Sequence, residues 1–276
     1  MRTNEVYSYL HIQIPVMIGL TLFPGLGYIF LGWLNDIYIG AVVWYFAVIL
    51  ISLRGYFLYI NFDIKNMSEA NLEDWYAKTS ILFYFFFLAW AVIFLIYARE
   101  SESGMHYIAI FTEIGASTVA AALLFPDKKL YKPIILFLII PLTIYFFLLG
   151  TWYGYVLTAF AATFGWVLFY AANGSNTLFR KTIFQATHDF LTGIYNRQYF
   201  VECLQKKMND LKQSSKFSYI LLIDLDYFKT VNDSLGHDVG DHLLQEVVKR
   251  MQNNLPENTM VARLGGDEFI ITGSNY

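Results

Sequence analysis

The sequence contains little charge and almost no cysteine. Only 15% of its 276 residues are charged, whereas soluble globular domains contain about 25%. This shortage excludes an ordinary water-soluble protein over most of the length. Cys203 is the single cysteine, which excludes an intrachain disulfide and a cysteine-based zinc site. The net charge of -3 is small and evenly spread, so we expect no nucleic-acid partner.

In place of charge the sequence has apolar residues, which make up 57% of the chain. Roughly half of the charged residues lie in the last third, from residue 189 onward. This shift in composition predicts a membrane domain over residues 1–174 and a water-soluble domain over 189–276. Asn173 to Asn176 are typical of a helix end, so a separate connecting helix is expected over 175–188.

The membrane domain contains about six stretches that are long and apolar enough to span a bilayer as helices. They lie near residues 11–32, 37–60, 79–98, 105–125, 133–150 and 152–172. Pro24 and Gly25 interrupt the first stretch, which is therefore expected to be kinked or re-entrant. No small-residue cleavage site follows it, so a secretory signal peptide is not expected.

Lysine and arginine residues between the spans predict the orientation of the chain. With six spans and the N-terminus inside, only Arg99 falls on the outer side. The inner segments hold Arg2, Lys65, Lys78, Lys128, Lys129, Lys132, Arg180 and Lys181. This bias predicts a multi-pass protein of the inner (plasma) membrane with its soluble domain in the cytoplasm. A chain of five spans would still keep that domain inside.

Two ionisable residues lie within the predicted spans. Glu113 is either a functional residue or a carboxyl group hydrogen-bonded to a neighbouring helix, because an intramembrane charge is costly. Arg54 lies near the inner end of its span, where its long side chain can reach the headgroups.

The soluble domain contains an apolar run from Phe217 to Ile223, which is followed by Asp224 and Asp226. Such a run is typical of a buried central strand with the two acids at its end. Strand alternation puts both carboxylates on one face, unless one turns away where the strand ends. Carboxylates with a nearby backbone carbonyl suit Mg²⁺ bound together with substrate phosphates.

A polar, glycine-rich turn from Asn232 to Asp241 follows and leads into an amphipathic helix. Asp241 is expected in the first turn of that helix. There it either compensates the helix N-terminus or, with the Asn232 amide, recognises the edge of a base.

The last motif is a hairpin of two short strands around Gly265 and Gly266. Two glycines allow positive φ at both turn positions and leave space for a nucleotide to approach the backbone. Asp267 and Glu268 follow at once, and they meet Asp224 if the hairpin pairs beside the first strand.

Taken in order, these motifs resemble the GGDEF family of diguanylate cyclases. The resemblance covers residues 189 to about 272. It includes Asp189-Phe-Leu-Thr-Gly-Ile-Tyr-Asn-Arg197, Asp224-Leu-Asp-Tyr-Phe-Lys229, Asn232-Asp233, Gly236-His237, Gly240-Asp241 and Arg263-Leu-Gly-Gly-Asp-Glu-Phe269. It implies an α-helical transmembrane bundle followed by an α/β domain with a ferredoxin-like core similar to polymerase palms. Two such domains, facing each other in a homodimer, condense two GTP to cyclic diguanylate and release pyrophosphate.

The resemblance also implies a role for individual residues. Asp224, Asp267 and the Leu225 carbonyl look like the ligands of Mg²⁺, or of Mn²⁺ in its place. Asn232 and Asp241 look like the guanine readers. The turn at Gly265 and Gly266 lies against the triphosphate. Glu268, together with Asp267, looks catalytic, and Glu268 is the candidate for deprotonating the attacking 3′-hydroxyl.

Two departures from the family pattern stand out. Many members carry an inhibitory Arg-x-x-Asp site before the two glycines, but Pro256 to Thr259 occupy that place here, so feedback by that route is not expected. The family domain is usually much longer than 189–276, so the domain is expected to be incomplete at its C-terminus.

Three functions are therefore compared. The first is a membrane-anchored diguanylate cyclase that is regulated through its membrane domain. The second is a catalytically inactive nucleotide-binding protein that signals by contact, which the incomplete domain favours. The third is a transporter, against which the absence of an inverted repeat argues.

Overall fold

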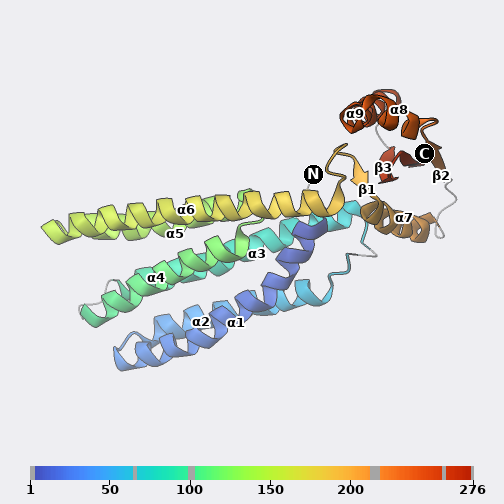
Figure 1. Cartoon of the computed structure of the whole chain (residues 1–276). Helices are drawn as coiled ribbons and strands as arrows, with labels where there is room; N and C mark the ends of the chain where they lie inside the picture. Colours follow the sequence, from blue (N-terminus) through green and yellow to red (C-terminus); the bar gives the residue numbers. More distant parts are fainter. Residues whose placement is uncertain (1–3, 65–66, 99–102, 212–217, 257–258, 275–276) are drawn as a thin grey trace. The chain divides into compact units, whose positions relative to one another are not determined.

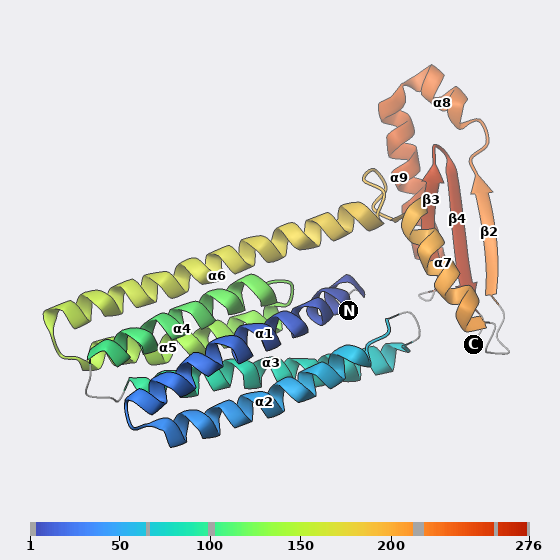
Figure 2. The same ribbon diagram turned by 90° about the horizontal axis from the view of Figure 1, so that it is seen from below.

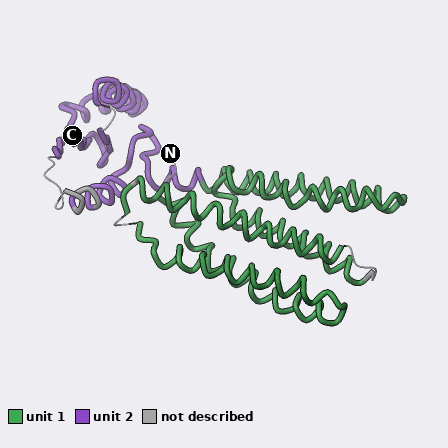
Figure 3. Tube along the Cα trace, turned by 180° about the vertical axis from the view of Figure 1, so that it is seen from behind, with its two compact units in different colours: residues 1–179 green, residues 180–276 purple. Residues whose placement is uncertain are grey.

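The computed structural model describes residues 4–64, 67–98, 103–211, 218–256 and 259–274. The chain forms two compact units, Met1–Phe179 and Arg180–Tyr276 (Figure 3). The first unit consists of long helices and the second contains a small mixed sheet with helices.

Six long helices dominate the first part of the chain (Figure 1). They are α1 (Asn4–Leu34), α2 (Tyr38–Ile60), α3 (Glu69–Tyr97), α4 (Ser103–Leu124), α5 (Lys128–Leu148) and α6 (Trp152–Thr187). All six are long and apolar enough to cross a membrane, which confirms the predicted number. Helix α1 continues through Pro15 and Pro24. The expectation of a re-entrant segment is therefore wrong; packed apolar helices tolerate proline because neighbouring groups satisfy the freed backbone.

Among helices α1 to α5, each packs against the next one in sequence order. Two tryptophans join α2 to α3 through their indole N–H groups. Trp44 donates to the Ala89 carbonyl at 2.6 Å, and Trp75 donates to the Leu58 carbonyl at 3.1 Å. Because both donors are buried, these bonds fix the axial position of α2 against α3.

Helix α6 has no break where the sequence predicts one. It runs without interruption from Trp152 to Thr187, so the expected helix end at 173–176 is wrong. Asn176 is fully buried, and its Nδ2 donates to the carbonyls of Phe125 and Pro126, both at 2.8 Å. This residue therefore makes a tertiary contact with the α4–α5 connection instead of a cap. The domain boundaries at 174 and 188 stay predictions.

The second unit places seven short elements after α6. They are β1 (Tyr195–Asn196), α7 (Arg197–Leu211), β2 (Ser218–Asp224), α8 (Phe228–Leu235), α9 (His237–Asn254), β3 (Met260–Gly265) and β4 (Glu268–Ser274). The sheet order is β1-β3-β4-β2, and among the described strands only the β1–β3 pair is parallel. Figure 2 shows β3, β4 and β2 side by side in this order. Side chains of α8 and α9 pack on buried residues of β3 and β4, such as Phe269 and Ile271, and form the core.

Strand β2 does not lie where its sequence suggests. It pairs with β4 alone among the described strands and forms an edge of the sheet. Ile220, Leu221 and Leu222 are 50%, 50% and 66% exposed. The expectation of a buried central strand is therefore wrong for the described residues, because no described strand covers the outer edge of β2.

Candidate active site

The turn between β3 and β4 has the conformation that the two glycines predict. Gly265 has a φ of 152° and Gly266 a φ of 54°, so both lie where other residues are strained. A Cβ at either position would meet no atom within 4 Å. Backbone conformation, and not packing, therefore demands glycine here, and the turn is open for a ligand to approach.

The acidic residues of the predicted site meet through the strand register. Strand β4 lies beside β2, and Asp224 is paired with Glu268 across the two strands. Directly opposed residues have Cβ atoms about 4.5–5.5 Å apart. Asp267 precedes Glu268 in the turn and is half-buried, whereas Asp224 and Glu268 are exposed. The hairpin thus lies beside the first strand, as the sequence analysis required for these carboxylates to meet.

Asp226 falls outside this arrangement. Strand β2 ends at Asp224, so strand alternation does not extend to Asp226. Asp226 is followed by Tyr227, whose φ of 62° turns the backbone away from the strand direction just before α8 begins at Phe228. Of the two alternatives, the structure agrees with the one in which an acid turns away where the strand ends.

The predicted metal ligands are hard oxygen donors, which is the chemistry Mg²⁺ prefers. The Leu225 carbonyl accepts the Phe228 amide at 3.3 Å and keeps a second lone pair for a cation. Among the described residues, no three His, Cys, Asp or Glu side chains lie close enough to form a complete metal site. Two carboxylates and one carbonyl fit an ion whose remaining ligands come from phosphates and water.

The predicted guanine readers lie on two helices and not in one turn. Asn232 is in α8, and its side-chain Oδ1 is buried without a hydrogen-bond partner among the described residues. Asp241 is exposed in the second turn of α9, because Gly236 starts the helix at His237. Asp238 is the acid of the first turn. The helix-compensation interpretation of Asp241, which requires the first turn, is therefore wrong.

The Asn232 amide occupies the space that a Cβ on Gly240 would fill. A Cβ on Gly240 would collide with the Asn232 Oδ1 and would lie 2.9 Å from its Cγ. Gly240→Ala is therefore expected to displace this amide and to weaken guanine nucleotide binding by about tenfold, the loss of one hydrogen bond of roughly 1.4 kcal/mol. Alanine at the same time favours the helix by up to about 1 kcal/mol.

Equilibrium binding of a fluorescent GTP analogue checks this prediction, with hydrogen exchange of α9 recorded in parallel. Gly174→Ala is the matched control, because a Cβ there would meet nothing within 4 Å. Unchanged affinity in Gly240→Ala would remove Asn232 from base recognition.

The sequence analysis did not predict an ion pair between Asp189 and Arg263. This pair joins the start of the first motif, at Asp189, to the turn at Gly265 and Gly266. The Arg263 Nη1 lies 3.0 Å from the Asp189 Oδ1, and its Nε and Nη2 donate to the Gly266 carbonyl at 3.0 and 2.7 Å. The side chains of Arg263 and Asp189 are only 12% and 18% exposed. Arg263 therefore holds the Gly266 carbonyl, and with it the turn, in a fixed position.

Asp189 is also bonded to its own loop. Its Oδ1 accepts the Thr192 amide at 2.9 Å and the Thr192 hydroxyl at 2.6 Å. Burial acts to raise the pKa of Asp189, but the hydrogen bonds from Thr192 and Arg263 outweigh it and lower that pKa. The carboxylate is therefore charged at neutral pH and holds the entrance loop to β3. The only sequence signal for the contact between Asp189 and Arg263 is that both residues belong to the motifs described above.

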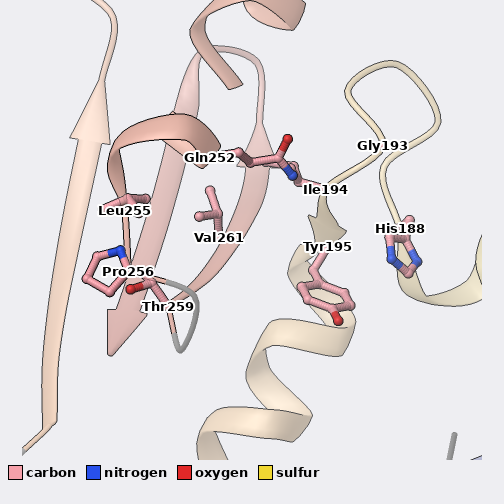
Figure 4. A pocket seen from close by; sticks show the side chains of 9 residues that line it. All are labelled: His188, Gly193, Ile194, Tyr195, Gln252, Leu255, Pro256, Thr259 and Val261. Atoms are coloured by element: carbon pink, nitrogen blue, oxygen red, sulfur yellow. The ribbon is translucent and has the colours of Figure 1, made fainter. Parts of the chain in front are cut away.

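A pocket of about 340 Å³ lies away from the glycine turn and includes His188, Tyr195, Gln252, Pro256 and Thr259 in its lining (Figure 4). The rings of His188 and Tyr195 lie tilted at 38° to each other with their centroids 4.7 Å apart. Burial lowers the pKa of His188. Pro256 and Thr259 stand at the ends of the stretch that replaces the family's inhibitory site, and they bring no charge. Glu257 and Asn258 lie outside the described residues, so the expected lack of feedback stays a prediction.

The ionisable residues of the helical unit differ in their surroundings. Glu113 is fully buried in α4, and neither carboxylate oxygen has a hydrogen-bond partner among the described residues. The expected hydrogen bond to a neighbouring helix is thus not found there. Arg54 is exposed on α2. Arg2, Lys65 and Arg99, used above to predict the orientation, lie outside the described residues.

The match to a family model lies in the second unit. The family described as "Diguanylate cyclase, GGDEF domain" matches residues 186–275. Diguanylate cyclase TpbB of Pseudomonas aeruginosa is 42% identical over 87 residues, which cover 32% of this chain and 20% of that protein. Probable diguanylate cyclase DgcC of Escherichia coli is 31% identical over 116 residues, which cover 42% of this chain and 31% of that protein.

Two solved structures are each similar to about a third of the chain. The GGDEF domain of TpbB from Pseudomonas aeruginosa is 41% identical with a TM-score of 0.30, covering 31% of this chain and 50% of that one. The GGDEF domain of DgcB from Caulobacter crescentus, in complex with c-di-GMP, is 28% identical with a TM-score of 0.32, covering 33% and 53%.

The matched segments span less than a third of the length of these two curated relatives. The family match begins at residue 186, near the end of α6, and includes every motif of the candidate site. Residues 186–275 of this chain are therefore a GGDEF domain that is homologous to the GGDEF domains of diguanylate cyclases.

Proposed function

We propose that the protein is a membrane-anchored diguanylate cyclase whose helical domain regulates its GGDEF domain. The observation that carries this proposal is the strand register that opposes Asp224 and Glu268 beside an open two-glycine turn. Carboxylates at the end of a strand, next to accessible backbone, are suited to binding a nucleoside triphosphate together with a metal ion. Homology to diguanylate cyclases supports GTP as the substrate.

The proposed reaction joins the 3′-oxygen of one GTP to the α-phosphorus of another and releases pyrophosphate, twice for each cyclic product. Glu268 takes the proton of the attacking 3′-hydroxyl. Asn232 and Asp241 hold the guanine, and the turn at Gly265 and Gly266 accommodates the triphosphate. Since each domain holds one GTP, two domains must face each other in a homodimer.

Asp224, Asp267 and the Leu225 carbonyl would hold Mg²⁺ or Mn²⁺. When bound, such an ion neutralises phosphate charge and favours in-line attack. The protein's own contribution is orientation: the β2–β4 pairing and the Arg263 contact with Gly266 hold these ligands and the turn in one arrangement.

A second candidate function rests on the exposed edge of β2. Because Ile220, Leu221 and Leu222 are half or more exposed, this strand offers backbone and apolar surface to another chain. The alternative is therefore a nucleotide-binding regulator that signals by contact and makes no product.

The first experiment is an assay of cyclic diguanylate formation from GTP and Mg²⁺ by the detergent-solubilised protein. The 276-residue chain is compared with a chain extended by the second half of a related GGDEF domain. We expect product from the extended chain and none when EDTA removes the metal. GTP binding without product in both chains would favour the contact regulator.

We also propose that α1 to α6 cross the plasma membrane with the GGDEF domain in the cytoplasm. The lysines at the start of α5 and the basic residues late in α6 support this orientation. A membrane-impermeant maleimide added to intact cells is therefore expected to leave Cys203 unlabelled and to label it after permeabilisation.

The control for this orientation is Thr151→Cys in a Cys203→Ser background. Thr151 lies in the α5–α6 connection at the opposite end of the helices, so it should be labelled in intact cells. Labelling of Cys203 in intact cells would reverse the proposed orientation.

A further inference from the structure

A groove of about 400 Å³ runs between α2 and α3. Its apolar lining consists of Leu50, Ile51, Ile81, Leu82 and Phe85. Leu50, Ile81 and Phe85 are each half-exposed, so the apolar surface is open on its outer side. The surface is in the part of the bundle that is proposed to face lipid.

Two cations line the same groove, one from each helix. Arg54 belongs to α2 and Lys78 to α3. The Trp75 indole bonds to the Leu58 carbonyl at 3.1 Å, which aligns these residues across the two antiparallel helices. Arg54 and Lys78 each lie about one helical turn further into the bundle than this bond. The two charges therefore stand at one level.

The helices approach closely at this level. A Cβ on Gly55, the neighbour of Arg54, would lie 3.2 Å from the Leu82 Cδ2. The short separation brings the two cationic side chains toward the same groove from opposite walls.

The local charges leave an excess of one positive charge. Lys78 pairs with Asp74 on its own helix, and both side chains are largely exposed, at 48% and 60%. Exposed pairs of this kind contribute little, so Lys78 can exchange this partner for another anion. The Arg54 Cζ lies 5.8 Å from the centroid of the Phe57 ring, over its face. An aromatic ring carries no net charge, so it is not a counter-ion.

An occupant that complements this groove needs an anion at the cationic level and an apolar chain that continues along the helices. An anionic phospholipid has both in one molecule. A neutral apolar helix would fill the lining but would leave Arg54 without an anion. Basic pockets between transmembrane helices on the cytoplasmic side suit anionic headgroups for this reason.

We infer that the α2–α3 groove is a binding site for an anionic phospholipid, with the headgroup phosphate at Arg54 and Lys78 and an acyl chain along Ile81 and Phe85. The inference rests on the proposed placement of these helices in a bilayer. It adds to the cyclase proposal a lipid contact on the first unit.

The test is native mass spectrometry of the full chain in detergent, titrated with phosphatidylglycerol or phosphatidylcholine. The wild type is expected to retain phosphatidylglycerol preferentially. Each cation near an anionic headgroup contributes about a fivefold gain in affinity, so Arg54→Gln with Lys78→Gln should lose about 25-fold. Asp74→Asn, which frees Lys78, is expected to strengthen binding.

Lys128→Gln is the matched control, since Lys128 is an exposed cation at the start of α5 and does not line the groove. An equal loss in this control, or no loss in the double variant, would overturn the inference. Competition by soluble glycerol phosphate at the lipid's own concentration would also overturn it, because the apolar lining would then contribute nothing. Release of the wild type from membranes by carbonate would instead refute the bilayer placement and the site with it.

Discussion

Glu268→Gln is expected to lower cyclic diguanylate synthesis by about 10²- to 10⁴-fold, the range for loss of a general base. Glutamine keeps the size of the side chain and one acceptor oxygen, but it cannot take a proton. Glu268 stands opposite Asp224 on the neighbouring strand, and its side chain is exposed. It is thus accessible to the hydroxyl of a bound nucleotide without rearrangement of the sheet.

The rate of product formation in the extended chain measures this effect. Glu246→Gln is the control, because the Glu246 carboxylate is partly exposed on α9 and forms a 3.4 Å surface pair with Lys249. The control should retain the wild-type rate, and both variants should remain in the membrane fraction. Synthesis at the wild-type rate by Glu268→Gln would remove this residue from the chemistry.

Arg263→Ala is expected to lower the free energy of unfolding of the GGDEF domain by about 2–4 kcal/mol. The substitution leaves the Asp189 carboxylate, which is only 18% exposed, without its counter-ion. It also frees the Gly266 carbonyl, which accepts two hydrogen bonds from the guanidinium. The glycine turn should therefore loosen along with the domain entrance.

Hydrogen exchange of the β3 and β4 amides in the full chain measures this loss. Arg250→Ala, at an exposed position of α9, is the control and should change the opening free energy by less than about 0.5 kcal/mol. Equal protection in Arg263→Ala and the wild type would mean that the ion pair does not hold the turn.

Acid should remove the same stabilisation. The folded-state pKa of Asp189 is lowered, so its contribution is present above the unfolded-state pKa of about 3.9 and is lost as the pH falls through the folded value. The difference between the wild type and Arg263→Ala is therefore expected to shrink below about pH 4. An undiminished difference there would point to packing of the arginine stem instead.

Much of the candidate site could be predicted because its requirements are local. Gly265 and Gly266 adopt positive φ because of their own lack of a Cβ, and the hairpin around them follows from that turn. The meeting of Asp224 with Glu268 could be stated only as a condition. It depends on which strand pairs with β4, and neighbours in sequence do not decide that.

The six apolar helices, the acidic GGDEF motif and the turn conformation could all be read from the sequence, because each depends on local composition or backbone preference. The packing of the folded chain was needed to show that α6 continues through Asn176, that β2 lies at an edge, and that Arg263 holds Asp189 and Gly266 together. It likewise brought Arg54 and Lys78 to one groove. Each of these depends on contacts between residues far apart in the chain, whose free energies no local pattern contains.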